Sequence, residues 1–264
     1  MRRLALIAAL AFAPPAAAQP APDAAERVFI ASDSTAAAYP ADQYPQMGWG
    51  MFLRCALPAS AQVVNMARGG RSTKTYREEA LWAVLLTQVR PGDTVLIQFG
   101  HNDEDMQKPW RHTEAKGDFT ANLTAMVADV RRRQAVPVLL TPVARDAFAN
   151  GRIQETHGDH ALAVRDVAAA TGTPLIDLNA DSMAFLDRAG ETGAKRYFMI
   201  YTPADGIARF PQGHVDTTHL NELGARAIAA LVAQGLGGLG VPIAARVRAA
   251  APDSVRALGD STCP

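Results

Sequence analysis

The sequence has no excess of charge of either sign and very little cysteine, and both shortages limit what the protein can do. Its 264 residues carry 26 lysines and arginines and 26 aspartates and glutamates, so the net charge is zero. Nucleic acids and anionic membranes attract proteins with a basic surface, so neither is expected as a partner. The chain has only two cysteines, and it contains no His-Glu-x-x-His motif and no clustered Cys/His pattern. We therefore expect no metal site.

Long apolar runs are also scarce beyond the first residues. Arg2 and Arg3 precede an apolar stretch over residues 4–12, which is too short to cross a bilayer. Small residues at 16–18 then offer a cleavage site. This pattern predicts a signal peptide over residues 1–18 and a periplasmic or secreted protein, with a short buried N-terminal helix as the alternative. No later run is long enough for a membrane anchor.

The remaining chain is predicted to form one domain. Residues 19–26 are rich in proline, alanine and aspartate and indicate a flexible lead-in, followed by a folded domain over 27–250 and a C-terminal tail over 251–264. We expect a monomer. Export would permit a disulfide between Cys55 and Cys263, although two unpaired thiols remain an equal alternative because the sequence cannot give their distance.

Strand-like and helix-like segments alternate along this domain. Such alternation predicts an α/β fold, in which helices cover both faces of a parallel sheet. In folds of this kind, ligands bind beyond the carboxyl ends of the strands. The predicted strands are 28–31, 63–65, 94–99, 136–140 and 174–178, and the predicted helices are 49–57, 75–89, 119–134, 160–171 and 221–234.

One motif imitates a cofactor site. Gly235, Gly237 and Gly240 match the G-x-G-x-x-G fingerprint of dinucleotide-binding proteins. That fingerprint has meaning only between a strand and a helix, whereas here it follows a helix. We interpret it as a flexible helix end and expect no cofactor.

Four polar clusters suit the steps of acyl transfer. Three follow predicted strands, at 32–35, 67–72 and 100–103, and the fourth, at 216–219, precedes the last helix. A serine in a turn that enters a helix exposes its hydroxyl beside backbone N–H groups that can hold an oxyanion. Glycine lets another N–H approach the substrate, and asparagine adds a neutral donor. An Asp-x-x-His pair can orient an imidazole toward the serine.

The same clusters resemble the four sequence blocks of the SGNH/GDSL hydrolase superfamily, and most closely those of the rhamnogalacturonan acetylesterase family. The blocks are SDST, ARGGRS, FGHND and DTTHLNELGA, accompanied by Gly48-Trp49-Gly50 and Thr156-His157-Gly158. Four blocks in the right order form a specific pattern, although each alone is weak. The resemblance extends from Val28 to Leu231 and implies a single three-layer α/β/α domain with a five-stranded parallel sheet, of the flavodoxin-like kind.

The resemblance also assigns roles to individual residues. It implies that Ser34 is the nucleophile, that His219 is the general base and then the acid, and that Asp216 orients His219. The oxyanion hole would consist of the N–H groups of Ser34 and Gly70 and the side chain of Asn102. One position departs from the family, because Ser32 replaces the usual glycine and raises the question whether its hydroxyl crowds the acyl pocket.

Other residues near the blocks are candidates for the substrate cleft. Trp49 and Tyr76 could stack on a sugar, but a core position is the simpler interpretation of an aromatic residue. Arg71, Arg145 and His157 could line the cleft, with loop packing as the alternative for Arg145 and His157. Outside this set, Asp33 is predicted to fix a turn and His101 to have a structural role.

The predicted function is that of a secreted serine esterase that removes O-acetyl groups from plant cell-wall polysaccharide of the rhamnogalacturonan or xylan type. An acetylated polysaccharide or oligosaccharide would be its substrate. Two alternatives stay open. One is a broad-specificity esterase, lipase or thioesterase that acts on small or lipid esters, and the other is a non-catalytic carbohydrate-binding protein with the same fold.

Overall fold

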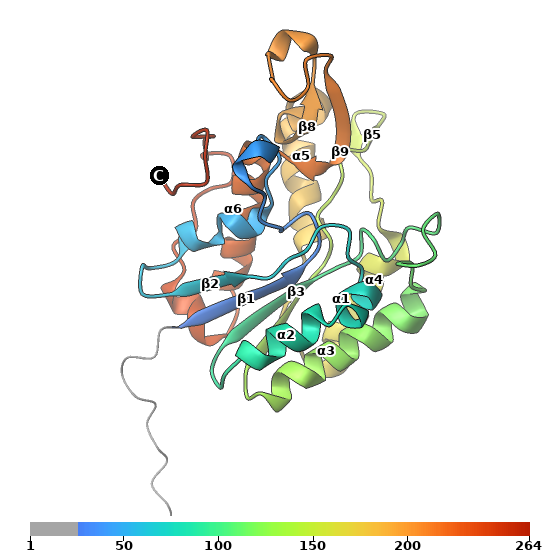
Figure 1. Cartoon of the computed structure of the whole chain (residues 1–264), viewed down its shortest axis with the longest axis vertical. Helices are drawn as coiled ribbons and strands as arrows, with labels where there is room; N and C mark the ends of the chain where they lie inside the picture. Colours follow the sequence, from blue (N-terminus) through green and yellow to red (C-terminus); the bar gives the residue numbers. More distant parts are fainter. Residues whose placement is uncertain (1–25) are drawn as a thin grey trace, which may run out of the picture.

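The computed structural model describes residues 26–264 (Figure 1), so the predicted signal peptide and nearly all of the lead-in lie outside the described residues. Its centre is a five-stranded parallel sheet with the strand order β2-β1-β3-β4-β7. The predicted α/β fold with this sheet is confirmed. The strands of the sheet are β1 (Arg27–Ser32), β2 (Gln62–Asn65), β3 (Thr94–Gln98), β4 (Val136–Leu140) and β7 (Leu175–Ile176).

Two hydrophobic cores lie on opposite faces of this sheet. Successive side chains of a strand point to opposite faces, and Phe29 on β1 accordingly packs into one core while Val28 and Ile30 pack into the other. Helices α1 to α4 cover the first face, and α5 and α6 cover the second (Figure 1). The helices are α1 (Thr73–Glu78), α2 (Leu81–Gln88), α3 (Thr120–Arg132), α4 (Gly158–Thr171), α5 (Leu178–Ala194) and α6 (Glu222–Gly237).

Shorter elements connect these layers. Two antiparallel hairpins are formed by β5 (Phe148–Ala149) with β6 (Arg152–Ile153), and by β8 (Phe198–Tyr201) with β9 (His214–Leu220). The β8–β9 hairpin projects beyond the sheet at the top of Figure 1. One π-helical turn, η4 (Ala115–Phe119), precedes α3. The 3-10 turns are η1 (Ala41–Gln43), η2 (Trp49–Met51), η3 (Leu53–Ala56), η5 (Lys195–Tyr197), η6 (Pro203–Asp205) and η7 (Pro242–Arg246).

Several predicted helices differ from the observed ones. The segment 49–57 forms two 3-10 turns rather than one α-helix. The helix expected over 75–89 is divided in two, because Ala80 adopts a left-handed conformation with φ of 59°. The predicted strand at 174–178 is shorter, since Asp177 caps α5 through a hydrogen bond from the N–H of Ala180. Neither α5 nor the two hairpins was expected.

The glycines of the G-x-G-x-x-G motif lie at the C-terminal end of α6, which agrees with the interpretation of this motif as a helix end. Gly235 has a packing reason to be glycine, because a Cβ atom there would come within 2.6 Å of the Ile176 side chain on β7. This position brings α6 close to the sheet. No helix among residues 26–264 has the length and apolar character needed to span a membrane.

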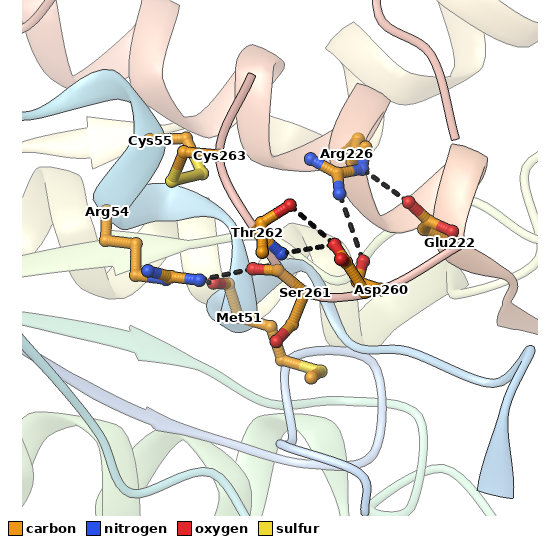
Figure 2. The surroundings of a disulfide bond; sticks show 9 residues. All are labelled: Met51, Arg54, Cys55, Glu222, Arg226, Asp260, Ser261, Thr262 and Cys263. Atoms are coloured by element: carbon orange, nitrogen blue, oxygen red, sulfur yellow. Dashed lines mark hydrogen bonds and ion pairs between the residues drawn. A yellow bond between two sulfur atoms is a disulfide. The ribbon is translucent and has the colours of Figure 1, made fainter. Parts of the chain in front are cut away.

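The C-terminal tail is fastened to the start of α6 (Figure 2). Cys263 forms a disulfide with Cys55 of η3, and their Cα atoms are 5.2 Å apart. The carboxylate of Glu222, buried in an ion pair with Arg226, accepts the backbone N–H groups of Leu258 and Gly259. The tail therefore completes the hydrogen bonding of a buried ion pair, as buried charges require.

Candidate active site

Ser34 lies in a tight turn directly after β1. The carboxylate of Asp33 accepts hydrogen bonds from the N–H and the hydroxyl of Thr35, which fixes the turn as predicted for an aspartate at this position. The Tyr39 hydroxyl donates to the carbonyl oxygen of Ser34 at 2.9 Å. The expectation that this turn enters a helix is wrong, because the next elements are the 3-10 turns from η1 onward.

Behind the turn lies a buried polar network centred on Gln98 of β3. Its side-chain oxygen accepts the indole N–H of Trp49 at 2.7 Å and the hydroxyl of Ser32 at 3.2 Å. The hydroxyl of Ser32 therefore points to this network, and Ser32 does not line the cavity beside Ser34. Gly48 packs against the backbone that directly follows the Ser34 turn. A Cβ atom at position 48 would lie only 2.2 Å from the carbonyl oxygen of Ala37, so this position requires glycine.

The Asp-x-x-His pair lies on a distorted strand of the β8–β9 hairpin. Met199 is paired with Asp216, but its neighbour Phe198 is paired with Leu220, so three residues of β9 bulge out between these pairs. The bulge closes on the Asp216 carboxylate, which accepts the backbone N–H groups of Thr218 and His219 at 2.9 Å. These backbone hydrogen bonds hold the Asp216 carboxylate in place independently of its contact with the imidazole.

Ser34, His219 and Asp216 form one continuous chain of contacts. The Nε2 atom of His219 lies 3.0 Å from the Ser34 hydroxyl, and its Nδ1 atom lies 2.7 Å from the Asp216 carboxylate. Burial would raise the pKa of Asp216, but the hydrogen bonds from His219 and Thr218 outweigh it and hold the pKa below its usual value. Asp216 therefore stays ionised and keeps the proton of His219 on Nδ1, which leaves Nε2 free to accept one from the serine.

Hydrogen-bond donors without protein acceptors gather beside Ser34. Within the described part of the chain, the N–H groups of Ser34 and Gly70 have no acceptor. Gly70 adopts a φ of +79°, a left-handed conformation that favours glycine. The Asn102 amide donates one N–H to the carbonyl oxygen of Arg71 at 2.9 Å and, since an amide nitrogen carries two, has another to offer. Ser34, Gly70 and Asn102 all line the same cavity, which has a volume of about 620 Å³.

Of the two interpretations of Trp49 and Tyr76, the structure bears out the core position and contradicts the candidate role in the cleft. Both side chains are fully buried, so neither can stack on a sugar. Trp49 belongs to the network of Gln98, whereas Tyr76 packs edge-on against Phe99 and donates its hydroxyl hydrogen to the carbonyl oxygen of Met66.

The three other cleft candidates have different positions. Arg145 lines the cavity and forms an ion pair with Glu104, which also lines it. The side chain of His157 is fully buried beside this pair. Its ring nitrogens contact the Glu104 carboxylate and the Val143 carbonyl oxygen. Arg71 is not among the lining residues, because its guanidinium is bound by Glu79 and by the Gly69 carbonyl oxygen. The cleft role therefore does not fit His157 or Arg71.

A second buried histidine, His101, borders the cavity. His101 lines it, and its Nδ1 atom is 3.4 Å from the free carboxylate oxygen of Asp33. Burial is the main reason why the pKa of His101 falls to about 4. His101 is therefore neutral at pH 7 and, among the described residues, forms no hydrogen bond with Ser34, which fits the structural role predicted for it.

A large part of the cavity wall was not predicted from the sequence. Six of the lining residues come from the segment after the FGHND block, which has no helical or strand periodicity. A usable signal was present, because this polar stretch places an aromatic residue, Trp110, among cationic ones. The six lining residues are Glu104, Asp105, Met106, Gln107, Lys108 and Arg111.

Comparison with known proteins identifies the family of this chain. Residues 33–227 match the GDSL-like Lipase/Acylhydrolase family. The chain is 39% identical over 219 residues to the probable rhamnogalacturonan acetylesterase YesY of Bacillus subtilis (strain 168), covering 83% of this chain and 96% of that protein. It is 37% identical over 218 residues to the rhamnogalacturonan acetylesterase RhgT of the same strain, covering 82% and 92%.

A solved structure supports the same assignment. The crystal structure of the YxiM protein of Bacillus subtilis superposes with a TM-score of 0.71 at 26% identity, covering 84% of this chain and 59% of that longer protein. The chain therefore belongs to the GDSL-like lipase/acylhydrolase family and is a carboxylic ester hydrolase, which confirms the predicted family and fold.

Proposed function

We propose that the protein is a secreted acetylesterase that removes O-acetyl groups from a plant cell-wall polysaccharide, rhamnogalacturonan first and xylan second. The observation that carries the proposal is the unbroken contact from Ser34 through His219 to Asp216 beside a cavity with free N–H donors. The proposed catalytic groups and the cavity lie together beyond the carboxyl ends of the parallel strands, where ligands bind in folds of this kind, and this supports the proposal.

The first step transfers the acetyl group to the enzyme. The Ser34 oxygen attacks the carbonyl carbon of the acetyl ester, and Nε2 of His219 accepts the hydroxyl proton. Negative charge develops on the carbonyl oxygen, where the N–H groups of Ser34 and Gly70 and the amide of Asn102 can stabilise it. The C–O bond to the sugar then breaks, and the sugar oxygen leaves with the proton that His219 held.

The second step regenerates the serine. Water attacks the acetyl-enzyme while His219 accepts one of its protons, and the same donors stabilise the second oxyanion. Acetic acid, which keeps the second proton of the water and releases it to the solvent, then departs as the bond to Ser34 breaks, and His219 returns its proton to the serine oxygen. Asp216 stays ionised throughout and stabilises the charged imidazole formed in each step.

Two findings support acetate on a polysaccharide as the substrate. Two relatives that each align over more than nine-tenths of their length are named rhamnogalacturonan acetylesterases. The walls of the cavity carry mostly polar and charged side chains, which suit a hydroxylated polymer better than a long acyl chain.

Export is the other part of the proposal. The charged and apolar pattern of residues 1–18 and the Cys55–Cys263 disulfide both fit a protein that matures in an oxidising compartment. Amino-terminal sequencing of protein recovered from the periplasm or medium should begin at Gln19. A mature protein that still begins at Met1 would contradict the proposed export.

The decisive experiment measures acetate release from acetylated rhamnogalacturonan and from acetylxylan, alongside hydrolysis of acetyl and octanoyl aryl esters. Ser34→Ala should lower kcat by about 10⁴-fold or more, the scale for loss of a nucleophile from a triad, with an unchanged melting temperature. Ser60→Ala is the matched control on an exposed serine. Near-normal turnover by Ser34→Ala would refute the mechanism, and a preference for octanoyl esters without acetate release from either polymer would refute the substrate.

A further inference from the structure

The segment 105–111 forms one wall of the cavity and has an uneven charge distribution. A single carboxylate, that of Asp105, faces two cations. Arg111 donates to it at 2.6 Å, whereas the ammonium of Lys108 lies 3.5 Å from the same oxygen. Arg111 thus satisfies the carboxylate, and the half-exposed Lys108 retains most of its capacity to bind another anion.

The remaining charges around the cavity are already paired. Glu104 binds Arg145 and contacts His157, and Asp216 accepts three hydrogen bonds in the β9 bulge. Neither carboxylate competes for Lys108 among the ion pairs of the described residues. The positive charge of this wall is therefore available to a ligand.

An exposed aromatic ring lies next to the lining residue Arg111, outside the set of residues that line the cavity itself. Trp110 is 57% exposed, and the guanidinium of Arg111 lies over its ring at 5.5 Å from the centroid. Arg111 also donates to the carbonyl oxygen of Gly70 at 3.3 Å, so it joins the Trp110 ring to the oxyanion-binding loop. A flat apolar ring beside a cation is a surface that accepts the face of a sugar and a charged substituent together.

We propose that residues 105–111 form a subsite for an acidic sugar, in which Trp110 stacks on the ring and Lys108, supported by Arg111, pairs with its carboxylate. The acidic sugar would neighbour the residue that carries the acetyl ester. This inference rests on the proposed polysaccharide function, and it selects a uronate-containing polymer over a neutral one. Binding of the neighbouring sugar would help to position the ester for attack.

The test compares kcat/KM for acetylated rhamnogalacturonan, for the same polymer with its carboxyl groups reduced to alcohols, and for p-nitrophenyl acetate. Lys108→Gln should lower kcat/KM about fivefold on the native polymer, the scale of a partly exposed ion pair, and leave the other two substrates unchanged. Trp110→Ala should lower kcat/KM about fivefold on both polymers and spare the aryl ester. Lys116→Gln, an exposed charge outside the cavity wall, should change none of the three.

A binding experiment separates this inference from the proposed function. In the Ser34→Ala background, calorimetry with a deacetylated rhamnogalacturonan oligosaccharide needs no turnover, and adding Lys108→Gln should weaken binding by a similar factor. If the wild type releases no acetate but this binding persists, the proposed function fails while the subsite stands. If Lys108→Gln leaves binding unchanged, or affects native and carboxyl-reduced polymers equally, the subsite is refuted.

Discussion

The Asp216 carboxylate lies 2.7 Å from Nδ1 of His219, only three residues away along the same bulged strand. Because two backbone N–H groups of the bulge also bind this carboxylate, Asp216→Asn should keep the loop in place while losing the negative charge. An asparagine cannot stabilise a charged imidazole, so we expect kcat to fall about 10³–10⁴-fold with little change in KM. Steady-state kinetics on p-nitrophenyl acetate measures this.

The control for Asp216→Asn is Asp166→Asn, which removes a charge from an exposed position of α4. Its kcat should equal that of the wild type. A variant Asp216→Asn with a nearly normal kcat would show that Asp216 only fixes the bulge and does not act in the reaction.

The side chain of Asn102 supplies a second test of the site. Asn102→Ala removes one donor from the oxyanion-binding group, and we expect kcat to fall about 10²–10³-fold, the scale for one such donor. Because Asn102 also holds the Arg71 carbonyl oxygen, the melting temperature must be measured in parallel. Asn122→Ala removes an amide that contacts Thr73 outside the cavity wall and should spare kcat. An unchanged kcat in Asn102→Ala would remove Asn102 from the oxyanion hole.

The strands and the polar clusters were predictable because they are local patterns. Continuous apolar runs such as β3 identify buried parallel strands, and the residues that follow them must meet at one edge of the sheet. The β8–β9 hairpin was not predictable in this way. Its bulge places polar residues in succession on β9, so the strand lacks the regular alternation that would identify it.

The sequence alone could not decide against the candidate cleft role of Trp49 and Tyr76, for a different reason. Whether an aromatic side chain lies in the core or at the surface depends on tertiary packing, and here a buried acceptor on Gln98 satisfies the indole N–H. The cavity wall at 105–111 was missed because an irregular loop has no periodicity to locate it. Its position depends on contacts across the fold, such as that between Arg111 and Gly70.

His101 predicts how the stability of the fold depends on pH. Its imidazole faces Asp33, His157 and Arg145, and burial lowers its pKa from an ordinary value near 6.5 to about 4. Between these values the unfolded chain binds a proton at His101 that the folded chain does not, so this group lowers the free energy of unfolding as the pH falls from 6.5 to 4. The buried carboxyl of Asp103, whose pKa burial raises to about 7, contributes with the opposite sign over the same range, so the contribution of His101 is measured as a difference between variants. The full effect is on the order of 3 kcal/mol.

Urea denaturation at several pH values tests this dependence. Relative to the wild type, His101→Gln should make the unfolding free energy fall less, or rise more, as the pH is lowered from 6.5 to 4, whereas His214→Gln, at a partly exposed position of β9, should leave the slope intact. Carboxylates whose pKa is lowered, such as Asp33, begin to reduce stability below about pH 5, equally in the wild type and in both variants. An unchanged slope in His101→Gln would mean that the buried imidazole is not its source.

The attachment of the C-terminal tail gives the last prediction. The disulfide closes a loop between residues 208 positions apart, and removing a disulfide from a native protein costs about 2–5 kcal/mol of unfolding free energy. The double change Cys55→Ser with Cys263→Ser should reproduce the unfolding curve of the reduced wild type. Since none of residues 251–264 lines the cavity that holds Ser34 and His219, kcat on p-nitrophenyl acetate should stay within about twofold.

Glu222→Gln should be the more destabilising change at the same site. It removes the partner of the buried Arg226 guanidinium, and an uncompensated buried charge costs about 3–5 kcal/mol. Glu191→Gln, at an exposed position of α5, is the matched control and should leave stability unchanged. Denaturation curves of all four proteins, recorded without reductant, measure the difference. If the cysteine variant unfolds at the wild-type midpoint, the disulfide adds nothing to stability; if Glu222→Gln does so too, the tail is attached without the buried ion pair.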